Sequence, residues 1–232
     1  MLAHLQGNER AQEIIERDDG FVEVTNGADV YFGPFRRWPA HQRRAMRFVR
    51  GRVLDVGAGA GRVALHLQER GHEVVAIDIS PLAVEVCRRR GVRDARVCAF
   101  EDIDASLGTF DTVVMFGNNF GLFGGARKAA RMLRRLHQLT TSNARIVAES
   151  RDVYATDDPA HLEYHERNRR RGRMAGQLRL RVRHRSHATP WFDYLIVSAD
   201  EMGELVAGTG WHVARLIRGE AGIYAAVIGK TN

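Results

Sequence analysis

Short apolar runs and helical repeats alternate along the central part of the chain. Residues 52–56, 73–78, 110–115 and 145–149 are short apolar runs rich in β-branched residues, which is typical of strands covered on both faces. Residues 62–70, 81–88 and 125–138 instead carry apolar side chains at helical spacing. Such alternation predicts an α/β fold in which a mostly parallel, doubly wound sheet is covered by helices.

The pattern ends differently towards the C-terminus. Residues 199–208 read as a last helix, and the apolar runs 211–217 and 222–228 read as two closing strands. We expect these two runs to pair as a hairpin.

With a third strand in the region that begins at Ala95, residues 110–115 are the fourth strand and residues 145–149 the fifth. An insertion separates this fifth strand from the last helix. Residues 158–168 suggest a short helix, and residues 177–185 alternate strictly, with apolar side chains on one face and arginines on the other. Residues 191–197 form a second strand-like run. We therefore expect an inserted β pair after the fifth strand, within about residues 151–197.

The segment before the first strand is expected to fold as a helical and aromatic cap over residues 1–50, with the core domain in 51–232. Residues 8–17 and 40–49 look helical, and residues 21–24 are ambiguous. Between them, residues 31–38 form an aromatic cluster broken by Gly33 and Pro34.

Glycines mark the end of the first core strand. Gly57, Gly59 and Gly61 follow Asp55 and precede a helix, so the loop presents free N–H groups and the positive end of a helix dipole to a ligand. A dinucleotide loop would place its third glycine where Arg62 stands. The glycine pattern therefore disfavours a pyrophosphate ligand.

An acid ends the second core strand. Asp78 lies about 20 residues beyond the glycine loop, the spacing at which a carboxylate reaches ribose hydroxyls in nucleotide-binding folds. Ser80 and Pro81 then begin a helix as its N-cap and first residue. A strand-end acid with only a structural role is the alternative interpretation.

The segments Val53-Leu-Asp-Val-Gly-Ala-Gly59 and Ala76-Ile-Asp-Ile-Ser80 together resemble the two best motifs of class I S-adenosylmethionine (SAM) dependent methyltransferases. This resemblance implies a Rossmann-like seven-stranded sheet with an antiparallel last strand. It also implies SAM as cofactor and S-adenosylhomocysteine (SAH) as product. The cofactor-binding residues that it implies are Asp55, Gly57, Ala58, Gly59, Gly61, Asp78, Ile79, Glu101, Asp102 and Asn118.

Some of these positions depart from the family pattern. Ala99 stands where the family usually has an acid near adenine. Glu101 and Asp102 are the substitutes that we consider, with an adenine amino group that faces water as an alternative, and both acids could simply cap the next turn. Asn118 and Asn119 end the fourth strand, where we assign Asn118 to the cofactor and Asn119 to the substrate, against a turn-forming role. The family's Asn-Pro-Pro-Tyr signature is absent there.

Tyr31 and Arg36 in the aromatic segment are substrate-binding candidates, because this segment folds over the cofactor in many family members. The competing interpretation is a hydrophobic plug. The catalytic group is unknown; His161 and His165 in the insertion are the candidates for a general base, against an ordinary surface role. They lie four apart, but no third ligand accompanies them, so we expect no metal.

Composition and charge limit the ligands and the cellular location that we expect for the protein. The net charge is +7 and the pI about 10.1, and nearly all basic residues are arginines. The dense run at residues 166–173 has three interpretations: an RNA contact, a clamp for an acidic molecule, or a solvated loop. Two cysteines, no apolar run long enough for a membrane span and no secretory signal lead us to expect a cytoplasmic location.

The expected function is methyl transfer from SAM to a small-molecule acceptor. RNA methylation is the alternative, and a SAM-binding paralogue without catalysis is a third hypothesis. The expected partner is the small-molecule acceptor, and nucleic acid is a less favoured partner. We expect no binding to a membrane, and a homodimer is an option. The sequence names neither the acceptor nor the atom that is methylated.

Overall fold

A seven-stranded mixed sheet forms the centre of the computed structural model, which describes residues 1–7, 12–25, 28–184 and 186–231. The strand order is β11-β12-β7-β6-β3-β4-β5, in which β12 runs antiparallel to both of its neighbours. The strands are β3 (Val53–Val56), β4 (Val74–Asp78), β5 (Ala95–Val97), β6 (Phe110–Met115), β7 (Thr140–Arg151), β11 (Trp211–Arg218) and β12 (Ile223–Lys230). The predicted α/β fold with its antiparallel closing strand is confirmed.

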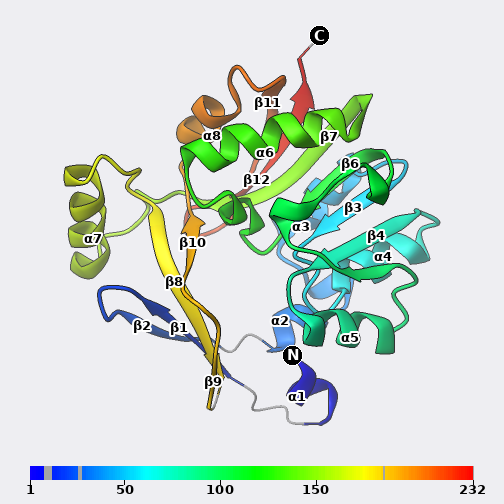
Figure 1. Ribbon diagram of the computed structural model, residues 1–232, viewed down its shortest axis with the longest axis horizontal. Coiled ribbons are helices and arrows are strands. Elements are labelled where there is room, and N and C mark those ends of the chain that lie inside the picture. The colour runs from blue at the N-terminus through cyan, green and yellow to red at the C-terminus, as the bar shows by residue number, and fades with distance from the viewer. Residues whose placement is uncertain (8–11, 26–27, 185, 232) are drawn as a thin grey trace.

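Helices cover both faces of this sheet (Figure 1). One face packs against α3 (Ala40–Ala45), α4 (Arg62–Glu69) and α5 (Pro81–Arg89), and the other against α6 (Ala126–Gln138) and α8 (Ala199–Val206). Each face has its own core cluster, because alternate strand residues point to opposite sides. The apolar side chains that repeat at helical spacing in α6 face the sheet, since Ala129, Met132, Leu133 and Leu136 are all buried.

Side-chain caps fix where several of these helices begin. The Ser80 hydroxyl accepts the Ala83 N–H at the start of α5, with Pro81 in the first turn as expected. Ser198 and Glu201 form a reciprocal capping box at α8. These local contacts explain why the helix starts were readable from the sequence.

A second, five-stranded antiparallel sheet stands beside the first (Figure 1). Its path is β10 (Phe192–Leu195), β8 (Gln177–His184), β1 (Glu13–Arg17) and β2 (Val22–Thr25), with β9 (His187–Ala188) also paired to β8. The predicted inserted pair is confirmed as β8 and β10. The helix α7 (Pro159–Arg170) precedes β8 at the place where a short helix was expected.

The helix predicted over residues 8–17 is wrong for its described part. Glu13–Arg17 is a strand, because Ile14 and Ile15 pair with β2 on one side and with β8 on the other. Residues 8–11 lie outside the described residues. The segment before residue 51 also holds α1 (Leu2–Leu5), α2 (Ala28–Phe32) and the 3₁₀ helices η1 (Phe35–Arg37) and η2 (Met46–Phe48).

Within the described residues, no helix has both the length and the apolar character that a membrane crossing needs.

The 3₁₀ helices η3 (Phe100–Asp102), η4 (Ala105–Leu107) and η5 (Asn119–Phe123) follow β5 and β6. η3 and η5 therefore lie near the carboxyl ends of parallel strands, the edge at which open α/β sheets bind ligands.

Candidate active site

A tight glycine loop joins β3 to α4. Gly57, Gly59 and Gly61 have φ angles of 70°, 58° and 76°, a region that favours glycine. A Cβ atom on Gly57 would lie 2.5 Å from the Asn119 Nδ2 atom, and one on Gly61 would lie 2.7 Å from Val92 Cγ2. The backbone of this loop therefore packs too closely for any larger residue at either position.

Asp78 fastens this loop from the end of β4. Its Oδ2 atom accepts the Gly59 N–H at 3.0 Å, and its Oδ1 atom accepts the Ser80 N–H at 2.9 Å. Burial raises the pKa of this carboxyl, and the two N–H donors act in the opposite direction. Each oxygen keeps a free lone pair, so Asp78 can still accept hydrogen bonds from a ligand.

Asp55 is the most unusual acid of the site. It lies in the middle of β3, its exposed fraction is 2%, and its Oδ2 atom has no hydrogen-bond partner among the described residues. Burial raises its pKa to about 7, while Arg62 lowers it and Asp78 raises it further. An unpartnered buried carboxyl oxygen is costly, which points to a partner that the chain itself does not supply.

Glu149, near the end of β7, organises a buried polar network on the same edge. Its Oε2 atom accepts the Gln42 Nε2 donor at 2.5 Å and lies 3.2 Å from His41 Nε2. Its Oε1 atom accepts the Asn118 N–H at 3.2 Å. Arg62 donates to Gln42 Oε1 at 2.9 Å, so the network reaches the first turn of α4.

Sequence reasoning missed this network. Glu149 ends an apolar run just as Asp78 does, and that shared position was the signal that could have identified it. Gln42 carried no comparable signal, because only the packing of α3 against the sheet brings it to Glu149.

Asn118 and Asn119 have separate tasks in the structure. Asn118 has a φ of 61°, and its buried Oδ1 atom has no partner among the described residues. Asn119 donates from Nδ2 to the carbonyl oxygens of Val56 at 2.9 Å and Gly57 at 3.0 Å. Asn119 thus supports the glycine loop, and its substrate-binding role stays a prediction.

Two tyrosines from outside the core converge on this edge. The Tyr31 ring lies 3.5 Å from where a Cβ on Gly59 would be, and burial raises its pKa to about 12. Tyr194 of β10 donates to the Asn118 carbonyl oxygen at 2.5 Å and packs against Gly121. Burial and the nearby Tyr31 both raise the pKa of Tyr194. The sequence marked the strand that holds Tyr194 but not the residue.

The remaining cofactor candidates line the same edge. Ile79 is 72% exposed directly after Asp78, and Ala58 donates its N–H to the Ile77 carbonyl oxygen. Glu101 and Asp102 in η3 are both exposed, and Glu101 forms an ion pair with Lys128 of α6. The choice between these two acids for adenine therefore stays a prediction.

The other candidates lie apart from this cluster. Arg36 is exposed in η1, and its role stays a prediction. His161 and His165 lie on α7, beside the small sheet and away from the glycine loop (Figure 1). His161 Nδ1 lies 3.2 Å from the Thr156 hydroxyl, and burial lowers the pKa of His165. The structure does not bring either histidine together with Asp55 or Asp78.

In the described part of the chain, no three histidine, cysteine or acidic side chains gather as a metal site would require. Cys87 and Cys98 are free thiols. Cys87 donates from Sγ to the Gly59 carbonyl oxygen at 3.3 Å, and burial raises its pKa to about 12. Cys87 is therefore part of the packing beneath the loop.

Comparison with known sequences agrees with this geometry. Residues 53–143 match the family model described as a methyltransferase domain. Ubiquinone biosynthesis O-methyltransferase of Xanthomonas oryzae is 41% identical over 68 residues, which is 27% of this chain and 28% of that protein. The tRNA 5-carboxymethoxyuridine methyltransferase of Escherichia coli is 33% identical over 72 residues, or 28% of each chain. These matches thus span little more than a quarter of the curated relatives' length.

Solved structures extend the similarity to the whole chain. A SAM-dependent methyltransferase from Bacteroides fragilis, in complex with SAH, is 28% identical with a TM-score of 0.83, covering 100% of this chain and 93% of that one. The CcbJ methyltransferase of Streptomyces caelestis shares the fold at 17% identity and a TM-score of 0.62, covering 89% and 96%. The chain belongs to the class I SAM-dependent methyltransferases.

The residues of this edge fit the cofactor of that family. The unpartnered oxygens of Asp55 and Asn118 are buried acceptors beside the glycine loop, where a cationic amino-acid moiety can bind. Asp78 has free acceptor positions for hydroxyl groups, and the exposed Ile79 offers an apolar surface next to it. A nucleoside with an attached ammonium group matches these acceptors and the apolar surface beside them.

Proposed function

We propose that the protein transfers the methyl group of SAM to a small-molecule acceptor bound between Tyr31 and Tyr194. The observation that carries this proposal is the convergence of these two half-buried tyrosines on the glycine-loop edge, one from the N-terminal segment and one from the insertion. Two aromatic walls close to the loop suit a small acceptor better than a large folded one.

Three parts of the chain would hold the cofactor. Asp78 would accept the ribose hydroxyls, Asp55 would face the ammonium group, and Ile79 would cover one side of the adenine. When bound, SAM supplies a methyl carbon that its sulfonium already activates. The chain then has to align the acceptor and exclude water.

Tyr31 and Tyr194 are suited to positioning rather than to proton removal. Both pKa values are raised by burial, so both phenols keep their protons at neutral pH. The Tyr194 proton is held by the Asn118 carbonyl, which fixes the ring. Both rings thus present rigid apolar faces to an acceptor, and the Tyr31 hydroxyl adds a donor.

The names of the similar proteins favour a small acceptor. Besides the ubiquinone enzyme, a 2-heptyl-1-hydroxyquinolin-4(1H)-one methyltransferase of Mycobacteroides abscessus is 34% identical over 77 residues. The tRNA methyltransferase keeps RNA as the second candidate.

The arginine run that the RNA interpretation used is largely ion-paired. Arg167 pairs with Asp18 at 2.9 Å, Arg170 with Glu166 at 3.4 Å, and Arg173 with Asp193 at 3.7 Å. These partners reduce the charge that α7 and the turn after it can offer to phosphates. We therefore rank RNA as acceptor below a small molecule.

We also propose a cytoplasmic location, on the grounds that two unpaired cysteines are kept as thiols and one of them packs under the cofactor loop.

Labelled methyl transfer tests the proposed function. The protein is incubated with SAM tritiated on its methyl group, together with either a panel of phenols, N-heterocycles and amines or total RNA. We expect label in the organic-soluble small-molecule fraction and none in acid-precipitable RNA. Label confined to RNA would contradict the small-molecule proposal, and label in neither fraction, despite calorimetric SAM binding, would favour the non-catalytic paralogue. NAD should not compete with SAM.

A further inference from the structure

Two hollows lie on either side of η2, on the sheet face that α3 and α4 cover. The first, of about 380 Å³, lies between η2 and strands β7, β11 and β12. The second, of about 570 Å³, lies between the α3–η2 segment and α4. Neither lining includes an aspartate or a glutamate, although the first includes two arginines and a lysine and the second four arginines.

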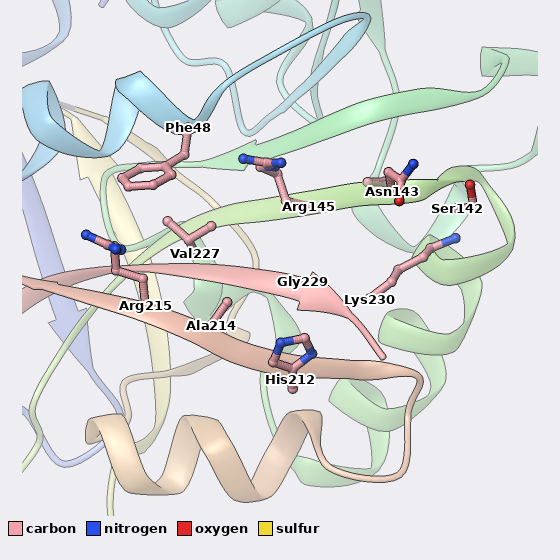
Figure 2. A pocket seen from close by; sticks show the side chains of 11 residues that line it. Phe48, Ser142, Asn143, Arg145, His212, Ala214, Arg215, Val227, Gly229 and Lys230 are labelled. Carbon is pink, nitrogen blue, oxygen red and sulfur yellow. The ribbon is translucent and has the colours of Figure 1, made fainter. Parts of the chain in front are cut away.

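Basic side chains from three strands surround the first hollow (Figure 2). Arg145 comes from β7, Arg215 from β11 and Lys230 from β12. The Arg215 guanidinium lies 5.4 Å from the centre of the Phe48 ring. Lys230 donates only to neutral carbonyl oxygens, those of His137 and Thr140. The positive charges around this hollow are therefore not neutralised from within its lining.

The second hollow is likewise lined by basic side chains without acidic neighbours in its lining. Arg43, Arg44 and Arg47 are exposed on α3 and η2, and Arg70 is exposed just after α4. Arg44 donates to the Arg218 carbonyl oxygen at 2.6 Å, and Arg70 donates to His66 Nε2 at 2.9 Å. Both of these partners are again uncharged acceptors.

Arg50 lies close to the first hollow, where it donates to the Asn143 carbonyl oxygen. Burial and the charge of Arg50 both lower the pKa of Arg145, which shows that like charges crowd here. Together these side chains form a surface that we call the cationic band. Its members are Arg43, Arg44, Arg47, Arg50, Arg70, Arg145, Arg215 and Lys230.

Across the described residues, no member of the cationic band forms an ion pair. The small sheet behaves differently, since Arg181 and Arg183 share Glu16 and Arg179 pairs with Asp193. The sequence pattern thus drew attention to arginines that have acids beside them. The structure places uncompensated arginines around η2 instead.

We propose that the cationic band binds the phosphodiester backbone of single-stranded nucleic acid. Arginine guanidinium groups match phosphate oxygens in charge and in fork geometry, and a row of them suits a ligand with repeated phosphates. The Phe48 ring, half-buried at the edge of the first hollow, offers a face for a base. A flexible strand can enter both hollows across η2, whereas a stiff duplex would bridge over them.

The first hollow of the band lies away from the cofactor edge, whereas Arg44 at the second hollow reaches the Arg218 carbonyl oxygen nearer to that edge. Arg145 precedes Glu149 by four residues of β7, a distance of roughly 13 Å along a strand. Lys230 ends β12, which runs antiparallel to β7, so it lies at the same amino-terminal edge. A bound strand would hold the protein on nucleic acid without entering the acceptor site, so the inference does not depend on the proposed function.

Fluorescence anisotropy with a labelled oligouridine of roughly 12 nucleotides tests this inference, with salt varied from about 50 to 200 mM. The test variant combines Arg47→Glu and Arg215→Glu, one change in each hollow. The matched control combines Arg127→Glu and Arg131→Glu, two exposed arginines on the outer side of α6, across the sheet. Both variants change the net charge equally, so only the position of the charge differs.

We expect the test variant to bind at least about tenfold more weakly at low salt, and the control to stay within about threefold of the unmodified protein. The dependence of log K on log salt should flatten by about 1.4 in the test variant, since each lost phosphate contact removes about 0.7. Methyl transfer to a small molecule should be unchanged in both.

Three results would overturn the inference: no binding by the unmodified protein at low salt, equal weakening by the α6 control, or tighter binding of a duplex of the same length. Circular dichroism melting verifies folding. If the test variant does not fold, Arg43→Gln combined with Arg47→Gln replaces it, because both side chains are exposed. That pair should still weaken binding by about threefold or more, and unchanged binding would count against the band.

Discussion

The hydroxyl group of Tyr194 donates a hydrogen bond to the backbone carbonyl oxygen of Asn118 at 2.5 Å. This bond joins the inserted strand β10 to the segment that follows β6, and Asn118 holds a left-handed backbone there. The insertion is therefore attached directly to the edge that carries the glycine loop, Asp55 and Asp78.

Replacing Tyr194 with phenylalanine should lower the free energy of unfolding by about 1–2 kcal/mol, because the Asn118 carbonyl oxygen loses its partly buried donor. Denaturant unfolding measures this change. Tyr154→Phe is the matched control, since the Tyr154 hydroxyl donates to Glu201 at 2.8 Å on a residue that is 50% exposed. Equal losses in both variants would mean that the Tyr194 hydrogen bond contributes no more to the free energy of unfolding than the exposed Tyr154 hydrogen bond.

Asp78→Ala should weaken SAM binding by roughly 1–3 kcal/mol, the usual loss when charge-assisted hydrogen bonds are removed. Part of this loss would come from the Gly59 N–H, which Asp78 holds in place. Isothermal calorimetry measures the affinity, with Asp94→Ala as a control at an acid that pairs with Arg96 near the surface. An unchanged dissociation constant in a folded Asp78 variant would show that the acid is only structural.

SAM affinity should rise as the pH increases from about 6 to 8. The raised pKa of Asp55, about 7, leaves the free protein with a neutral carboxyl at low pH, and an ammonium group binds best to the ionised form. Calorimetry across this range should show the rise in the unmodified protein and its loss in Asp55→Asn. A flat profile for the unmodified protein would mean that Asp55 does not face the ligand's charge.

Asp55→Asn should also change how stability depends on pH. The folded pKa of Asp55 lies above its unfolded value of about 3.8, so the folded state holds the extra proton between these values. The unmodified protein therefore loses stability as the pH rises through about 4 to 7, and the variant lacks this loss. Melting temperatures without SAM should favour the variant increasingly towards pH 8; a constant difference would contradict a raised pKa.

Gly61→Ala should destabilise the protein more than Gly71→Ala. Both glycines have positive φ angles, 76° and 85°, so both alanines carry backbone strain of about 1 kcal/mol. Only at Gly61 would the new Cβ also meet Val92 Cγ2, at 2.7 Å, whereas nothing lies within 4 Å at Gly71. Thermal unfolding of the two variants isolates this contact, and equal destabilisation would mean that Val92 moves aside freely.

The sequence alone determined the central sheet, its helices and the cofactor loop. These features depend on local signals: buried strands are short apolar runs, α6 repeats its apolar residues every turn, and only glycine tolerates the loop's backbone. Asp55 and Asp78 were identifiable because each has a fixed place relative to that loop. The sequence therefore marked this edge as the predicted cofactor site before any tertiary contact was known.

Only the tertiary structure decided the rest, because the contacts involved join residues that are distant in sequence. Glu13–Arg17 is a strand because β8, more than 160 residues later, pairs with it. The sequence of a short amphipathic segment does not indicate which distant strand will pair with it. Gln42 reaches Glu149 across 107 residues, and Tyr194 reaches Asn118 across 76. Folding likewise paired some arginines with acids and left those around η2 without them, a distinction that composition does not contain.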